Sequence, residues 1–131
     1  ASLSHYDSMN VLSMHALIGA YSTEGRDWLT ELREVLAGNI DYVCDFMKTE
    51  LPGVTAFRAQ GTYMLFVDCT DYCEAHNVPI AEILKRGWDA GIGWQDGRPF
   101  HGEHHIRLNL ALPNALVKEA CARMKQYVFC D

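Results

Sequence analysis

Apolar residues alternate with others along the segment HHIRLNLALP, residues 104–113. A repeat of two is typical of a β-strand that buries one face. The apolar residues that would share the buried face are Ile106, Leu108, Leu110 and Leu112. Arg107 and Asn109 would point to the opposite face. Because arginine keeps its charge and is seldom fully buried without a partner, we expect this opposite face to be solvated or to meet something absent from this chain.

Two segments in the N-terminal half repeat their apolar residues at steps of three and four, which predicts helices. Residues 8–21 would form the first, with Ser8 as its N-cap. This helix is apolar almost all round, which indicates neighbours on several sides. A longer helix would follow and stop at Pro52 and Gly53. Its apolar stripe comprises Trp28, Leu29, Leu32, Val35, Leu36, Ile40, Val43, Phe46, Met47 and Leu51.

Two more helices are predicted in the C-terminal half. Asn77 and Pro79 would open the first of them. Its inward face would consist of Ile80, Ile83, Leu84 and Trp88. The second would begin near Asn114. It would bury Leu116, Val117, Ala120, Cys121, Met124 and Val128.

Three further segments predict strands, at residues 54–58, 62–68 and 91–94. The segment 62–68, TYMLFVD, is apolar on both faces and should therefore be central in its sheet. The order of elements indicates an α+β fold in a single domain spanning residues 1–131, with a small antiparallel or mixed sheet of three to four strands and helices packed on one face.

Composition narrows the function classes. The chain has 131 residues, a net charge of −6 and eleven scattered lysines and arginines, which argues against nucleic acid as the main partner. No apolar run reaches the roughly 20 residues needed to span a membrane, and the first residues do not resemble a signal peptide. Five cysteines at irregular spacing favour a reduced, cytoplasmic protein. Cys44 and Cys121 would be small buried hydrophobes.

Few residues suggest chemistry. His101, His104 and His105 invite a metal hypothesis, but adjacent histidines on a strand point to opposite faces, so we expect no metal site. No GxSxG motif or phosphate-binding loop is present. From the residues alone, Arg107 beside the glycine-rich stretch GIGWQDG offers an anion-binding feature and not a complete active site.

Four sequence blocks, in this order, resemble a known family. They are GNIDYVCDFMKTELPGV, QGTYMLFVDC, GIGWQDGRPFHG and HHIRLNLALP. Together they resemble the C-terminal small domain of fold-type I pyridoxal 5′-phosphate (PLP) enzymes, in the class I/II aminotransferase family. The pattern is most similar to the cystathionine β-lyase or C–S lyase branch, and it runs from about Ala20 to Met124.

The resemblance implies that Arg107 binds the α-carboxylate of an amino-acid substrate. Arg98, Tyr63 and Phe100 are further candidates for the substrate site. The family's cofactor lysine and its other PLP-binding residues belong to an N-terminal large domain, so this chain would be an excised small domain that is inactive alone and binds no cofactor. Residues 1–21 would bridge to that domain. The parent is expected to be a cytoplasmic homodimer of amino-acid metabolism.

Two departures and three alternatives remain at this point. His101 is inserted in the segment Phe100-His101-Gly102, and Arg98 stands where smaller residues are common in the family. The sequence does not distinguish a lyase from an aminotransferase. The chain could also be a stand-alone binding domain, or a structural module in which Arg107 pairs with a surface carboxylate.

Overall fold

The computed structural model describes residues 9–130. The chain divides into two compact units, one up to Glu34 and one from Val35 onward. The predicted N-cap Ser8 lies outside the described residues. Helix α1 (Val11–Ala20) begins instead at Asn10, whose side chain accepts a hydrogen bond from the Ser13 amide at 2.8 Å.

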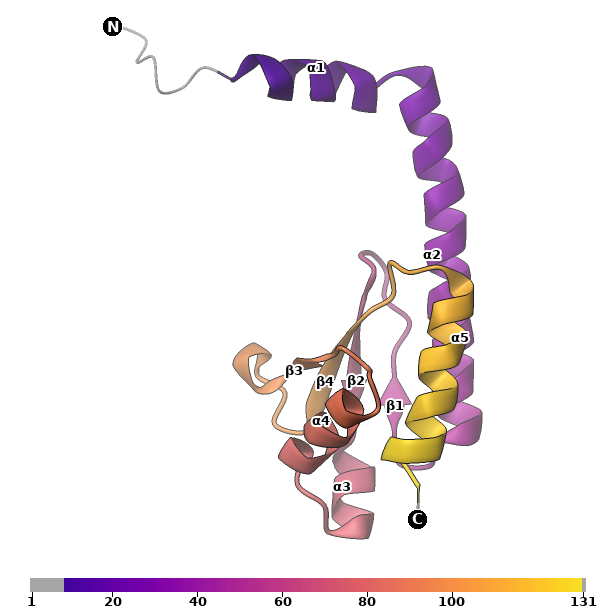
Figure 1. Cartoon of the computed structure of the whole chain (residues 1–131), viewed down its shortest axis with the longest axis vertical. Coiled ribbons are helices and arrows are strands. Elements are labelled where there is room, and N and C mark those ends of the chain that lie inside the picture. The colour runs from indigo at the N-terminus through magenta and orange to yellow at the C-terminus, as the bar shows by residue number, and fades with distance from the viewer. Residues whose placement is uncertain (1–8, 131) are drawn as a thin grey trace, which may run out of the picture. The chain divides into compact units, whose positions relative to one another are not determined.

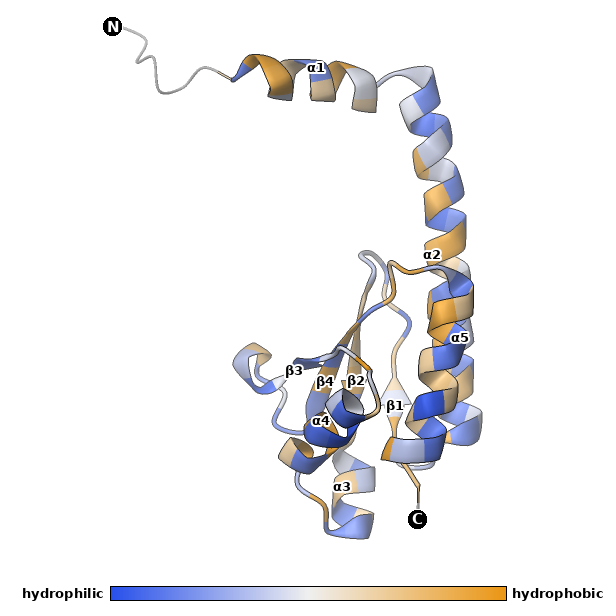
Figure 2. Cartoon of the chain, viewed as in Figure 1, coloured by the Kyte–Doolittle hydropathy of each residue, from blue (hydrophilic) through white to orange (hydrophobic). Residues whose placement is uncertain are grey.

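Helix α1 buries none of its residues. Figure 2 shows several orange, hydrophobic residues along its ribbon. Helix α2 (Thr23–Glu50) is long, as its stripe predicts, but only its second half is buried, through Asn39, Ile40, Val43 and Met47. Trp28, which belongs to the predicted apolar stripe, is 64% exposed.

A four-stranded sheet forms the centre of the second unit (Figure 1). Its strands are β1 (Thr55–Ala56), β2 (Met64–Asp68), β3 (Gln95–Asp96) and β4 (His105–Asn109). The order is β1-β2-β4-β3, and all three pairings are antiparallel. The predicted α+β class is confirmed, and the central position of β2 agrees with its apolar sequence.

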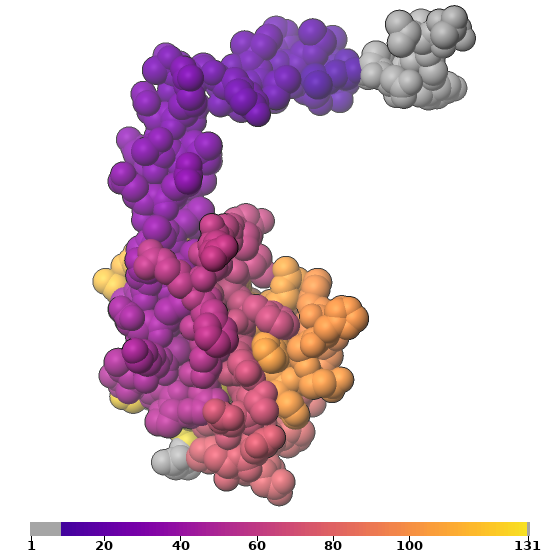
Figure 3. Space-filling view, turned by 180° about the vertical axis from the view of Figure 1, so that it is seen from behind, coloured from indigo at the N-terminus to yellow at the C-terminus, as the bar shows by residue number. Residues whose placement is uncertain are grey.

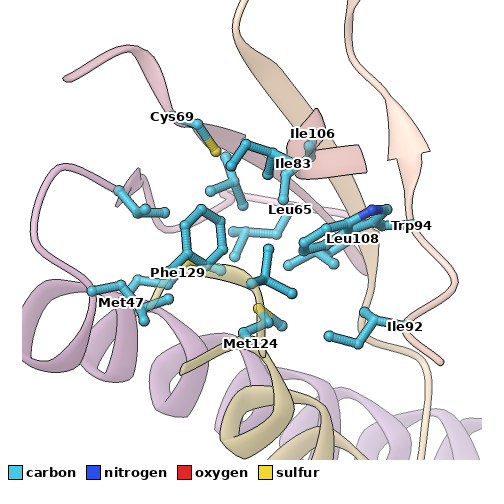
Figure 4. Close-up of a cluster of buried hydrophobic side chains, with 14 of the residues drawn as sticks. Met47, Leu65, Cys69, Ile83, Ile92, Trp94, Ile106, Leu108, Met124 and Phe129 are labelled. Atoms are coloured by element: carbon cyan, nitrogen blue, oxygen red, sulfur yellow. The ribbon is translucent and has the colours of Figure 1, made fainter. Parts of the chain in front are cut away.

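Helices cover one face of this sheet. They include α3 (Thr70–His76), α4 (Ile80–Asp89) and α5 (Asn114–Arg123), which continues into a π-helical turn, η3 (Met124–Val128). The sheet residues that point into the core are Leu65, Val67, Ile106 and Leu108. Figure 4 shows Leu65, Ile106 and Leu108 in one cluster with helix side chains such as Met47, Ile83 and Met124. Burial of this apolar surface is the main stabilising contribution.

The structure corrects several predicted boundaries. Residues 91–94 are not a strand: Ile92 and Trp94 are buried, and the paired strand is the next two residues. Strand β4 ends at Asn109, so Leu112 leaves the sheet and is 44% exposed. Leu116, expected to be buried, is 49% exposed because α5 turns that side chain outward.

Helix α3 was not predicted from the sequence. Asp68 accepts a hydrogen bond from the Thr70 amide at 2.9 Å at its start. Asn77 does not open the next helix; it ends α3 in the left-handed conformation, with φ of 51°. Helix α4 begins after Pro79, as predicted.

The inward face of α4 also differs from the prediction. Gly87, and not Trp88, occupies the buried position, and Trp88 is 62% exposed. The absence of a side chain at Gly87 admits the indole of Trp94, whose Nε1 donates a hydrogen bond to the Leu84 carbonyl at 3.1 Å. This packing fixes the segment that leads into β3.

The described residues contain no helix that is both long and apolar enough to cross a membrane. All five cysteines are free. Cys121 is buried, as predicted, whereas Cys44 is only half-buried. Burial raises the pKa of Cys121 to about 11, so this thiol is protonated at neutral pH.

Asn39 is the fully buried polar side chain of the described core. Its Nδ2 donates hydrogen bonds to the carbonyls of Leu110 and Leu112, at 3.0 and 2.9 Å. Its Oδ1 accepts one from Asn114 Nδ2 at 3.0 Å. Asn39 therefore connects α2 to the chain between β4 and α5, where the backbone carbonyls have left the sheet.

We expect Asn39→Leu to lower the free energy of unfolding by about 2 kcal/mol, because buried carbonyls lose their donors. Asn114→Ala, which removes one of the three hydrogen bonds, should cost about 1 kcal/mol. Urea denaturation followed by circular dichroism measures both. Equal midpoints for Asn39→Leu and the parent protein would contradict this role of Asn39.

Candidate functional site

The sheet face opposite the helices carries the candidate site. The strand register places one set of side chains on it, which we call the Arg107 face: Met64, Phe66, Asp68, Gln95, His105, Arg107 and Asn109. Arg107 is central, because both Phe66 and Gln95 pair with it across the strands. The alternation along β4 therefore orients Arg107 and Asn109 as the sequence predicts.

Two neutral groups hold the guanidinium of Arg107. Nη1 donates a hydrogen bond to Gln95 Oε1 at 3.0 Å. The ring of Phe100 lies under the guanidinium, with 3.9 Å between Cζ and the ring centroid. Over the described part of the chain, no acidic side chain forms an ion pair with Arg107. Arg107 is half-exposed.

Arg107 lines an open pocket of about 420 Å³. It is lined by Tyr63, Met64, Gly93, Gln95, Arg107 and Asn109. The volume is within the range of small-molecule sites, about 300–1,000 Å³. The pocket wall is polar where Gln95, Arg107 and Asn109 face it, so an anion with a further polar group suits it better than an apolar ligand.

Arg98 is arranged differently. It belongs to a short 3₁₀ turn, η2 (Arg98–Phe100), and its Nε and Nη2 donate to the carboxylate of Asp96, the shortest contact being 2.6 Å. Their mutual hydrogen bonds raise the pKa of Arg98 and lower the pKa of Asp96. Arg98 does not line the pocket.

Close packing fixes the loop between β3 and β4. Gly97 donates to the His105 carbonyl at 2.9 Å, and Gly102 donates to the Gly97 carbonyl at 3.1 Å. A Cβ at Gly102 would lie 2.5 Å from Phe66 Cζ, so this position requires glycine. The inserted His101 adopts a left-handed φ of 64°. Figure 3 shows this orange segment at the surface, where Phe100 is 50% exposed.

The histidines of residues 101–105 do not converge. His105 Nε2 lies 3.9 Å from Asp68 Oδ2. Burial raises the pKa of Asp68, but hydrogen bonds from Thr70 and the nearby His105 and His104 outweigh it and lower the pKa overall. Within residues 9–130, no three histidine, cysteine or acidic side chains are grouped to hold a metal ion.

The structure brings three of the four predicted site residues together. Tyr63 lines the same pocket as Arg107, and Phe100 stacks on the guanidinium. Gln95 was missed, because a single glutamine in a turn-rich segment carries no motif. Only the hairpin register, which pairs Gln95 with Arg107, reveals it.

The chain's own residues do not fit PLP. An amine is needed to hold the cofactor's aldehyde, and none of the described lysines lines the Arg107 pocket. Lys85 pairs with Asp89 at 2.7 Å, Lys125 contacts Glu50, and Lys118 lies over a tyrosine ring. Lys48 is exposed on α2, and no lysine lines the Arg107 pocket.

A second depression, of about 270 Å³, lies between α5 and residues 91–93. It is mostly apolar, and its charged residues Glu119 and Arg123 form an ion pair with each other. It therefore offers no free charge for a ligand, and the Arg107 pocket is the better candidate site although it is the more open and polar of the two.

Comparisons with known proteins agree with the sequence motifs. No model of a protein family matches the chain. A protein of Mycobacterium leprae named "Putative cystathionine beta-lyase" is 32% identical over 124 residues, which cover 86% of this chain and 31% of the relative. Cystathionine beta-lyase PatB of Bacillus subtilis is 28% identical over 89% of this chain and 30% of its own length.

Solved structures show the same relationship. The PLP-bound C–S lyase of Staphylococcus hominis superposes with a TM-score of 0.79 and 28% identity, over 92% of this chain and 32% of that enzyme. Aminotransferases are also among the similar folds. The chain spans about 30% of the length of the curated relatives it matches. The predicted resemblance is confirmed: this chain matches the C-terminal part of proteins named cystathionine β-lyases and of PLP-dependent C–S lyases and aminotransferases.

Proposed function

We propose that this chain is the substrate-binding C-terminal part of a PLP-dependent enzyme that cleaves C–S bonds of sulfur amino acids by β-elimination. Arg107 carries the proposal. Its guanidinium lies at an open polar pocket and has only neutral partners among the described residues. The relatives named as cystathionine β-lyases and C–S lyases support the reaction class.

Arg107 would bind the α-carboxylate of the substrate. A planar guanidinium can donate two parallel, charge-assisted hydrogen bonds to a carboxylate, which fixes the orientation of the amino acid as well as its position. Orientation matters because the bond to be cleaved must be aligned with the reacting groups. Tyr63 and Asn109, which line the same pocket, would border the rest of the substrate.

The remaining properties of the whole protein are part of this proposal. PLP would be held by an N-terminal large domain, to which residues 1–21 would bridge. The complete protein would be a cytoplasmic homodimer, and this chain alone would be inactive. Nucleic acid and membranes are not proposed as partners.

An aminotransferase of class I/II is the second candidate, because aminotransferases are also among the similar folds. A lyase and an aminotransferase both need the α-carboxylate of an amino acid to be fixed. The Arg107 pocket therefore suits either reaction, and the residues that decide between them would lie outside this chain.

The experiment compares the full-length protein with the 131-residue chain, both supplied with PLP. We expect the full-length protein to release a thiol from cystathionine, measured with a thiol reagent, and the 131-residue chain to release none. Transfer of the amino group to a keto acid without thiol release would support the aminotransferase. Thiol release by the isolated chain, or no reaction of the full-length protein with any amino acid, would contradict the proposal.

We also expect Arg98 to adjust side-chain specificity. Its ion pair with Asp96 is exposed, so solvent screens it and a distal carboxylate of a substrate can compete for the guanidinium. The ratio of kcat/KM for cystathionine to that for an S-alkyl cysteine should fall in Arg98→Ala. An unchanged ratio would show that Arg98 has no role in side-chain specificity and only pairs with Asp96.

A further inference from the structure

Two arginines close together in the sequence, Arg98 and Arg107, differ in the charge of their partners. Arg98 is bound by the carboxylate of Asp96 through several short hydrogen bonds. Arg107 is held by an amide oxygen and an aromatic ring, both uncharged. A carboxylate beside Arg107 would compete with any anionic ligand, whereas an amide and a ring leave its positive charge available.

The geometry of the two contacts leaves donors free. A guanidinium has five N–H groups in one plane. Gln95 accepts from Nη1, and Phe100 contacts the flat face at 3.9 Å, where no N–H points. The edge formed by Nε and Nη2 therefore retains a complete fork for a carboxylate. The stack also restricts rotation of a side chain that otherwise loses about 2 kcal/mol of rotamer entropy on binding.

Both partners are themselves fixed by the hairpin. Gln95 is paired with Arg107 in the strand register. Phe100 belongs to the η2 turn, and its amide donates to the Gly97 carbonyl at 2.8 Å. The β3–β4 hairpin thus places an acceptor at one edge of the guanidinium and a ring on its face before any ligand binds.

We infer that Gln95 and Phe100 are positioning residues that orient the guanidinium of Arg107 without neutralising its positive charge. The pocket would therefore select amino acids with a free α-carboxylate. This inference rests on the proposed role of Arg107. It adds that selectivity depends on the neutrality of residue 95 and on the aromatic ring at residue 100.

The test uses the full-length, PLP-loaded protein and two probes, L-alanine and L-alaninamide. Neither carries a leaving group on Cβ, and the amide lacks the carboxylate. Their dissociation constants are measured by titration, from the change in visible absorbance of the bound cofactor. The ratio of the constant for L-alaninamide to that for L-alanine reports selectivity for the carboxylate.

We expect Phe100→Leu to reduce this ratio by about tenfold. Phe100→Trp should keep the ratio close to that of the parent protein, because a larger ring keeps the cation–π contact. Gln95→Glu should reduce the ratio by about a hundredfold, since its carboxylate would occupy Arg107. Gln95→Met should reduce it by only about threefold, because a neutral side chain of similar length leaves the charge free. In steady-state kinetics with the amino-acid substrate, Phe100→Leu and Gln95→Glu should raise KM and change kcat little. Partial unfolding would instead lower the apparent kcat and leave KM unchanged.

Matched controls are Phe57→Leu and Gln126→Glu, at exposed positions outside the Arg107 face. They should leave the ratio unchanged. If the parent binds both probes equally, the proposed role of Arg107 fails. If the parent discriminates and Arg107→Ala does not, yet Phe100→Leu and Gln95→Glu match the parent, Arg107 keeps its role and the inference is overturned.

Discussion

Replacing Arg107 by alanine in the full-length protein is expected to lower kcat/KM for its amino-acid substrate by about 10²- to 10⁴-fold. A hydrogen bond to a charged group contributes about 1.5–3 kcal/mol, and the guanidinium can donate two to a carboxylate. Each 1.36 kcal/mol corresponds to about tenfold in rate. Steady-state kinetics with cystathionine measures the loss.

The same substitution should leave the stability almost unchanged. Arg107 is half-exposed, and it contacts one amide oxygen and one exposed ring. Arg107→Lys should recover only part of the activity, because an ammonium group cannot reproduce the two parallel hydrogen bonds. Arg58→Ala is the control: it removes an exposed arginine that is paired with Asp41. Wild-type kcat/KM in Arg107→Ala would show that the carboxylate binds elsewhere.

The alternation along residues 104–113 was enough to predict both the strand and the outward direction of Arg107. Alternation works there because a strand with one buried face has a period of two, and Ile106 and Leu108 are indeed buried. The partners of Arg107 are harder to predict. Gln95 reaches it through hairpin pairing, which depends on register and not on local sequence.

Other errors have local physical causes. Helix α3 has only seven residues, Thr70–His76, too few for a helical repeat to be recognised. The stripe of α2 predicts burial at Trp28, but a stripe says only which residues share a face, and not whether anything covers them. The residues alone do not give Arg107 a role. Its proposed role, binding the α-carboxylate of a substrate, comes from the resemblance to PLP enzymes.

Gly87 shows why a hydrophobic pattern does not predict the burial of small residues. Its replacement should have a large effect on the free energy of unfolding. It occupies the inward position of α4 at which the hydrophobic pattern predicts Trp88. Glycine has no apolar side chain and is unfavourable in a helix by about 1 kcal/mol relative to alanine, so sequence alone gives no reason for it to face the core. In the structure, a Cβ on Gly87 would lie 2.0 Å from two ring carbons of Trp94.

We therefore expect Gly87→Ala to lower the free energy of unfolding by about 3 kcal/mol or more, because a methyl group has no space against a buried indole. Trp94 cannot move freely, since it is 1% exposed and its Nε1 is bonded to the Leu84 carbonyl. Gly38→Ala is the matched control. Gly38 is also helical, nothing lies within 4 Å of its added Cβ, and the substitution should stabilise the protein by about 0.5–1 kcal/mol.

A double substitution separates the clash from any other effect at Gly87. Trp94→Leu alone should destabilise the protein by removing buried surface and leaving a cavity. Once the indole is absent, adding Gly87→Ala should cost little, so the double variant should be about as stable as Trp94→Leu alone. Denaturant midpoints of the four proteins measure this coupling. If the losses in the free energy of unfolding for Gly87→Ala and Trp94→Leu simply add, contact with Trp94 is not the reason that position 87 requires glycine. Helix α4 would then require this glycine for another reason.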